Sequence, residues 1–112
     1  MAIMTVPAEW EPIGNAVFST VSSAIELTDT PDSGIAMPVS ADTAIIYIST
    51  KGVHISYDTG TATTGDALYP ASNFIVMENN RTALVGFSAV ESAASARIDV
   101  WYFNVSGRGR TN

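Results

Sequence analysis

The side chains that could carry out chemistry are few and scattered in this chain. His54 is the single histidine, and the chain contains no cysteine and no Gly-x-Ser-x-Gly motif. A protein zinc site is commonly built from roughly three or four convergent ligands, most often His or Cys. A serine hydrolase of the Gly-x-Ser-x-Gly type pairs its nucleophile with a histidine. The sequence therefore predicts no metal, no cofactor and no nucleophilic site, and we expect His54 to lie on the solvent side of a strand.

An Asp-Thr-Gly tripeptide at 58–60 has an enzymatic counterpart, because aspartic proteases carry a catalytic carboxylate in this motif. These enzymes need two aspartates that share a proton, and a short chain can supply the second by dimerising, as retroviral-type proteases do. The related Asp-Ser-Gly at 32–34 lies in a segment dense in turn formers. Tyr57 also stands where the protease motif has an apolar residue. We interpret 58–60 as a turn, and we judge the protease interpretation unlikely.

Trp101 and Tyr102 form an aromatic pair close to the end of the chain. Such a pair can provide a platform on which a sugar ring stacks, but aromatic packing at a sheet edge or subunit interface is the more common arrangement. The loop 58–66, rich in Thr and Gly, could contribute polar groups to a glycan site. A carbohydrate- or host-binding module built from this loop and Trp101 therefore stays open as an alternative.

Composition excludes several classes of partner. Hydrophobic residues make up 46% and charged residues 14% of the 112 positions, which is compatible with one folded domain and incompatible with a disordered chain. The formal net charge is −6, and the residues up to Gly107 contain 3 basic and 11 acidic side chains, a balance of −8. An acidic body does not favour nucleic acid or an anionic membrane surface. The first residues show no secretory signal pattern, and no apolar run approaches the length of a membrane-spanning helix.

The hydrophobic pattern predicts an all-β fold. An apolar run at 43–49 and an alternating run at 53–57 flank a short Gly-containing turn, which is typical of a β-hairpin with a three-residue loop. Further strands are expected at 16–23, 73–78, 82–88 and 95–103, with a short edge piece at 35–39. With turn signals every 8–14 residues or so, this predicts a single β-sandwich, jelly-roll or immunoglobulin-like, of about 7–8 antiparallel strands. We expect an extended N-terminal arm over 1–15, the sandwich over 16–103, and a flexible basic tail over 104–112.

Several of these segments together resemble a known class of proteins. A hairpin ends in an aromatic residue and is followed by Asp-Thr-Gly-Thr-Ala-Thr-Thr-Gly at 58–65, then Pro-Ala-Ser-Asn-Phe at 70–74, and the chain closes with Ala-Arg-Ile-Asp-Val-Trp-Tyr-Phe at 96–103. Over roughly residues 16–103, the chain resembles small all-β structural proteins of tailed bacteriophages, of the capsid decoration or cement type. The loop differs from the class pattern at Thr59, which separates the Asp from the Gly, and at Ala62, which stands where Pro would be.

The resemblance implies a non-enzymatic virion protein that decorates or cements a capsid, assembled in the host bacterial cytoplasm. Its expected partners are the major capsid protein or other virion proteins, and a homo-oligomer is expected, with a trimer as the first guess. Trp10 would anchor the arm either on a neighbour or on its own domain. The residues expected at interfaces are Trp10, Asp58, Thr59, Gly60, Thr61, Trp101, Arg108 and Arg110.

Overall fold

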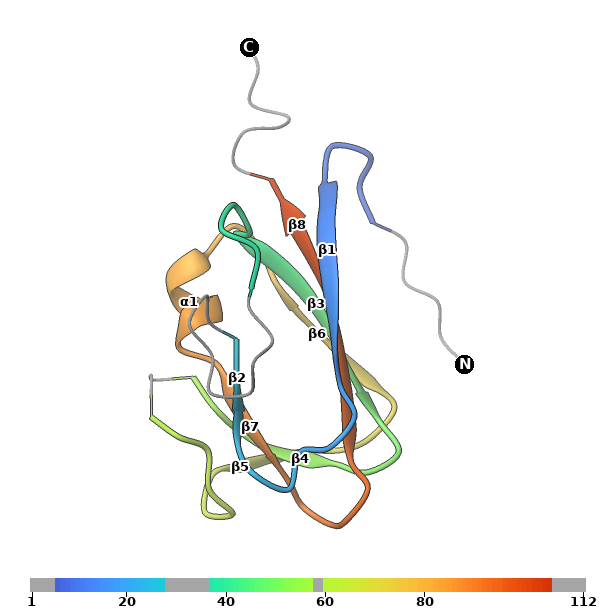
Figure 1. The fold of residues 1–112 in the computed structure, drawn as a ribbon, viewed down its shortest axis with the longest axis vertical. Helices are drawn as coiled ribbons and strands as arrows, with labels where there is room; N and C mark the ends of the chain where they lie inside the picture. Colours follow the sequence, from blue (N-terminus) through green and yellow to red (C-terminus); the bar gives the residue numbers. More distant parts are fainter. Residues whose placement is uncertain (1–5, 28–36, 58–59, 106–112) are drawn as a thin grey trace.

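The computed structural model describes residues 6–27, 37–57 and 60–105, and within them the fold is all-β, as the sequence predicts. Two antiparallel sheets of four strands each form two layers (Figure 1). Across sheet A the strands are β1 (Glu11–Phe18), β8 (Arg97–Asn104), β3 (Thr43–Ser49) and β6 (Asn73–Met77). Across sheet B they are β2 (Ile25–Glu26), β7 (Ser88–Glu91), β4 (Val53–Ser56) and β5 (Ala67–Tyr69).

The strands pair in a nested pattern along the chain. The first strand pairs with the last, β1 with β8, and the pairs β2·β7, β3·β6 and β4·β5 follow inward from the two ends. Two further pairs, β3·β8 and β4·β7, join these ladders into the two sheets. Successive pairs therefore alternate between the sheets: β1·β8 and β3·β6 lie in sheet A, and β2·β7 and β4·β5 lie in sheet B.

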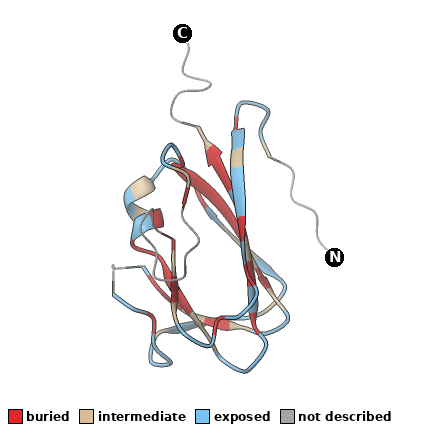
Figure 2. Cartoon of the chain, viewed as in Figure 1, coloured by how far each residue is buried: buried red, intermediate tan, exposed pale blue. Residues whose placement is uncertain are grey.

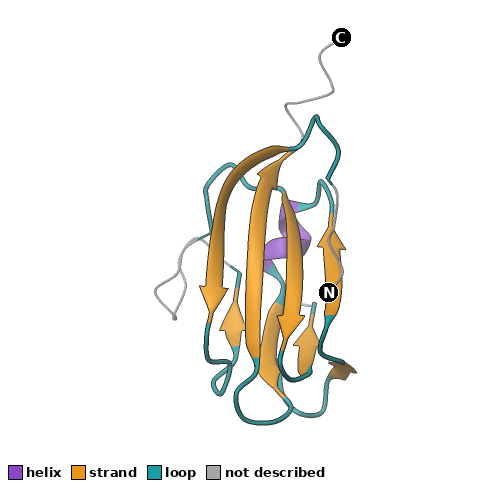
Figure 3. Ribbon diagram, turned by 90° about the vertical axis from the view of Figure 1, so that its right-hand side faces the viewer, coloured by secondary structure: helices purple, strands orange, loops and turns teal. Residues whose placement is uncertain are grey.

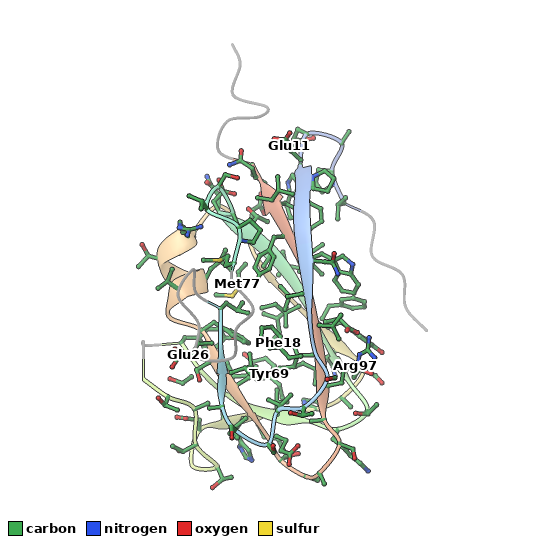
Figure 4. The ribbon with its side chains drawn as sticks, in the orientation of Figure 1. Glu11, Phe18, Glu26, Tyr69, Met77 and Arg97 are labelled. Carbon is green, nitrogen blue, oxygen red and sulfur yellow. The ribbon has the colours of Figure 1, made fainter. Side chains whose placement is uncertain are left out.

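The core lies between the two sheets and follows from strand alternation. On β8, Ile98, Val100 and Tyr102 are almost fully buried, while the residues between them are more exposed. Phe18 and Met77 point into the same interior (Figure 4), and strands of both layers carry buried residues (Figure 2). The strand predicted at 95–103 is thus confirmed as β8.

A short helix, α1 (Arg81–Val85), replaces the strand that the sequence predicts over 82–88. The Asn80 side chain caps the helix by accepting a hydrogen bond of 3.0 Å from the Ala83 amide. Arg81 then donates from Nη1 to the carbonyl oxygens of Pro38, at 3.2 Å, and Ala41, at 2.6 Å. Leu84 is fully buried and belongs to the core. The local β propensity of the segment is therefore overridden by a cap and by contacts distant in sequence.

The predicted hairpin over 43–57 is wrong, although both of its strands are present. β3 belongs to sheet A and β4 to sheet B, so the loop between them carries the chain from one layer to the other. Thr50 has a φ of 70°, a left-handed conformation that is uncommon for a β-branched residue, and its hydroxyl donates to the carbonyl of Ser95. This sharp corner separates the two strands instead of pairing them.

Two segment boundaries differ from those expected. β1 begins at Glu11, so residues 11–15 form part of sheet A and not of an arm, and Asn104 is the last residue of β8. The edge strand expected at 35–39 is absent from the part that the structure describes, since residues 37–40 form no strand. The remainder of that segment lies outside the described residues.

Candidate interaction surface

The outer face of sheet A carries large apolar side chains. The strand register places the side chains of four strands in rows across this face, which is turned toward the viewer in Figure 3. We define the outer face of sheet A by Asn15 and Val17 of β1, Arg97, Asp99, Trp101 and Phe103 of β8, Ile45 and Tyr47 of β3, and Phe74 and Val76 of β6.

Apolar groups of this face remain accessible to solvent. Trp101 is 40% exposed, Val76 is 43% exposed and Val17 is 39% exposed. On the same face, the rings of Tyr47 and Phe74 pack with their centroids 4.7 Å apart. Exposed apolar groups that form a contiguous patch, and are not scattered singly, are typical of interaction sites.

Trp10 covers one end of the same face. The segment before β1 turns back through a hydrogen bond of 3.1 Å from the Trp10 amide to the Pro7 carbonyl. The indole then packs edge-on against Phe103, with ring centroids 5.5 Å apart, and forms a small second core with Ile45. Trp10 is 8% exposed. In the single chain, this tryptophan therefore packs on its own domain.

The charges within this face neutralise each other. Arg97 and Asp99 form an ion pair with Nε and Oδ1 3.0 Å apart. The remaining residues that define the face are uncharged. On a protein with a formal net charge of −6, the outer face of sheet A therefore offers a partner an apolar contact with little electrostatic repulsion.

The outer face of sheet B is partly covered by the chain itself. The loop from β4 to β5 folds back so that the Ala62 amide donates to Ser88 Oγ at 3.0 Å, and both residues are buried. His54 donates from Nδ1 to the Asp66 carbonyl at 2.8 Å, which anchors the far end of the loop. Leu68 remains 57% exposed beside it. Small residues of the loop thus cover the part of this face around Ser88, while Leu68 stays open to solvent.

The expected interface residues do not form one surface. Trp10 and Trp101 share the outer face of sheet A, whereas Gly60 and Thr61 are exposed in the loop that follows β4 of sheet B. Asp58, Thr59, Arg108 and Arg110 lie outside the described residues.

The glycan site expected from Trp101 together with the loop 58–66 is not assembled, because the described part of that loop covers the opposite sheet.

Sequence reasoning missed the apolar residues that accompany Trp101. The sequence pattern places these residues on strands but predicts no surface role for them; they are Val17, Tyr47, Phe74 and Val76. The signal was present in β3, where residues 44–48 are uniformly apolar although a strand with one wet face would alternate. That run indicates that both faces of sheet A carry apolar groups.

Two tyrosines are held in their neutral form. Burial raises the pKa of the Tyr102 hydroxyl well above its usual value. Burial, followed by the hydrogen bond that Tyr57 donates to the Tyr69 hydroxyl at 3.3 Å, raises the pKa of Tyr57 as well. Both groups therefore behave as neutral hydrogen-bonding or packing groups at physiological pH.

Neither a metal site nor a known relative gives the described residues a further function. Among residues 6–27, 37–57 and 60–105, no three His, Cys, Asp or Glu side chains are grouped so that they could hold a metal ion. The one described helix is far too short to cross a membrane. In comparisons with known proteins, no family model, no curated protein and no solved structure matches the chain significantly.

Proposed function

We propose that the chain is a non-enzymatic virion structural protein that binds neighbouring subunits of a bacteriophage capsid through the outer face of sheet A. One observation carries the proposal. The two outer faces differ, since that of sheet B is partly covered by the chain's own loop and exposes Leu68 alone among its large apolar strand residues, while that of sheet A exposes Trp101, Val17 and Val76 without net charge. A surface of this kind is suited to lasting contact with a protein shell.

The nested strand pairing supports a jelly roll as the type of sandwich. In a jelly roll, an antiparallel ribbon of four strand pairs is wound into two sheets, and the pairs β1·β8, β2·β7, β3·β6 and β4·β5 follow that scheme. Jelly rolls are found in viral capsid proteins and in lectins. The fold type is thus compatible with the shell-binding proposal and with its alternative.

The mechanism in this proposal is mechanical. Each copy removes apolar area of the outer face of sheet A from water where it meets the major capsid protein or another virion protein, with Trp101 at the centre. Many copies then act together, so that individually weak contacts add up over the capsid surface. The site of action is the virion, and assembly takes place in the host bacterial cytoplasm.

Co-sedimentation with capsid shells tests the proposal. Purified protein is mixed with isolated shells of the encoding phage that lack it, and the bound fraction is measured against concentration. Val17→Glu places a charge on the outer face of sheet A, whereas Val85→Glu places the same charge on α1 at a closely matched exposure of 42% against 39%. We expect Val17→Glu to weaken binding about tenfold or more, which corresponds to about 1.4 kcal/mol, and Val85→Glu to leave it unchanged. Equal loss in both variants, or no binding of the parent protein, would contradict the proposal.

A carbohydrate-binding module of a phage tail or head fibre is the second candidate. The observation that favours it is the half-exposed Trp101, because Asn15 lies directly across from it on β1 and Asp99 precedes it by two residues on the same face. An aromatic platform with flanking amide and carboxylate groups can stack on a sugar ring and bind its hydroxyls. Binding of the isolated protein to a glycan array, lost in Trp101→Ala, would favour this function over shell binding.

A further inference from the structure

The edges of the two sheets are protected against pairing with another chain, with one exception. β1 carries Pro12 and a register shift between Pro12 and Gly14, and both features disrupt a continuous ladder. At the edges of sheet B, β2 has two residues and β5 has three, so each offers few backbone groups.

β6 has none of these protective features. It has five residues, Asn-Phe-Ile-Val-Met, without charge or proline, and its register with β3 is unbroken. In the part of the chain that the structure describes, β6 pairs with β3 on one side and with no strand on the other. Its outward backbone groups therefore form a free template for an additional strand.

We propose that β6 pairs antiparallel with β6 of a second copy of this chain, so that the two sheets A join into one continuous sheet across a two-fold axis. An antiparallel strand is complementary to itself, and a two-fold contact requires the same surface from both copies. The proposal does not depend on the virion role, because it follows from the sheet edge alone.

Charge favours a second copy at this edge. The chain has a formal net charge of −6, so two copies repel each other over most orientations, but β6 itself contains no charged residue. The nearest acid is Glu78, directly after the strand. If Ile75 of each copy lies on the two-fold axis, Glu78 faces Ser72 of the other copy, and the two Glu78 residues are separated by about 20 Å along the strand direction.

Side chains also match in this register. Phe74 of one copy lies opposite Val76 of the other on the outer face, and both residues belong to the outer face of sheet A. Aromatic and β-branched residues form favourable cross-strand pairs. The outer faces of sheet A of the two copies then lie side by side across the joined strands.

The solution mass of the full chain, measured by sedimentation equilibrium over a range of concentrations, tests this inference. We expect a monomer–dimer equilibrium. Val76→Lys should raise the dissociation constant about tenfold or more, since a lysine on an edge strand opposes pairing. Val17→Lys is the matched control: it makes the same change on the same face, at a similar exposure, on the opposite edge strand. We expect this variant to dimerise like the parent.

A second measurement on the unmodified protein checks the contact directly. Hydrogen exchange of the β6 amides should slow as the protein concentration rises, whereas exchange in β1 should not change. A monomer at all concentrations, a trimer, or equal loss of association in both lysine variants would overturn the inference. A trimer would require a head-to-tail contact between two different surfaces, and dimers that persist in Val76→Lys would place the contact elsewhere.

Discussion

The two outer faces of this small protein differ in how the chain itself covers them. The outer face of sheet B is partly covered by the chain's own loop, with a buried hydrogen bond from the Ala62 amide to Ser88. The outer face of sheet A is covered at one end by Trp10 and left open around Trp101. The comparison separates apolar groups that stabilise the fold from apolar groups that remain available to a partner.

The two tryptophans should give the largest difference in stability. Trp10→Ala removes a side chain that is 8% exposed and packed on Phe103, and we expect it to cost about 3–5 kcal/mol of unfolding free energy. Trp101→Ala removes a side chain that is 40% exposed, and we expect a cost of about 1 kcal/mol because much of the indole already contacts water. Urea denaturation of both variants measures the two values. Equal costs would remove the distinction between the covered and open parts of the face.

Ser88→Ala tests the closure of sheet B. The substitution leaves the buried Ala62 amide without its acceptor, and we expect a loss of about 1–3 kcal/mol. Ser92→Ala is the control, because its hydroxyl donates to the Gly52 carbonyl at an exposed position where water can replace it. Thermal denaturation gives the stabilities, and hydrogen exchange at Ala62 reports the loop itself. Unchanged exchange at Ala62 would show that this bond does not hold the loop in place.

Alkaline pH should distinguish a buried tyrosine from a half-exposed one. The pKa of Tyr102 is raised in the folded state, so its contribution to stability is complete below the unfolded pKa and is lost as the pH rises from there toward the folded pKa. Above about pH 10, this group lowers stability with a slope that approaches 1.4 kcal/mol per pH unit.

Tyr102→Phe should therefore flatten the pH dependence of stability in this range. Tyr57→Phe should flatten it less, because Tyr57 is 43% exposed and solvent screens its environment. Urea denaturation between pH 8 and about pH 11 measures both profiles. A larger effect at Tyr57 would reverse the order of burial described for the two residues.

The ion pair on the outer face of sheet A should have the smallest effect. Arg97→Gln breaks the contact with Asp99, but the Arg97 side chain is 48% exposed, and we expect a change in unfolding free energy of at most about 0.5 kcal/mol. The control is the same measurement at high salt, which should reduce even this difference. A loss of unfolding free energy above about 1 kcal/mol would mean that the ion pair stabilises the folded state and does not merely neutralise charge on the surface.

The fold class could be predicted because it depends on local patterns. Ile98, Val100 and Tyr102 alternate with more exposed residues, and that alternation alone identifies β8 and its inner face. Which strands pair with each other could not be predicted from local patterns. The runs at 43–49 and 53–57 are strands, but whether they form a hairpin or cross between layers depends on β6, β7 and β8, which lie far away in sequence.

The helix and the interaction surface show the same limit. Asn80 gave a local signal for the start of α1, yet the Arg81 contacts with Pro38 and Ala41 depend on the folded chain. Trp101 could be singled out from its type, whereas Val17 and Val76 become part of a surface only when β1 and β6 take their places at opposite edges of sheet A. The resemblance to phage decoration proteins and the roles it implies remain predictions.

The position of β8 has a consequence for how the protein is made. β8 is the last of the described strands to be synthesised, yet it lies in the middle of sheet A, between β1 and β3. Until β8 has been synthesised, β1 and β3 have no strand between them to pair with, and sheet A is incomplete. Sheet A therefore cannot form in full until residues 97–104 have been synthesised, and β1 and β3 lack their shared partner strand until then. A chain truncated before Arg97 would lack the strand that joins β1 to β3, and we expect it not to build sheet A.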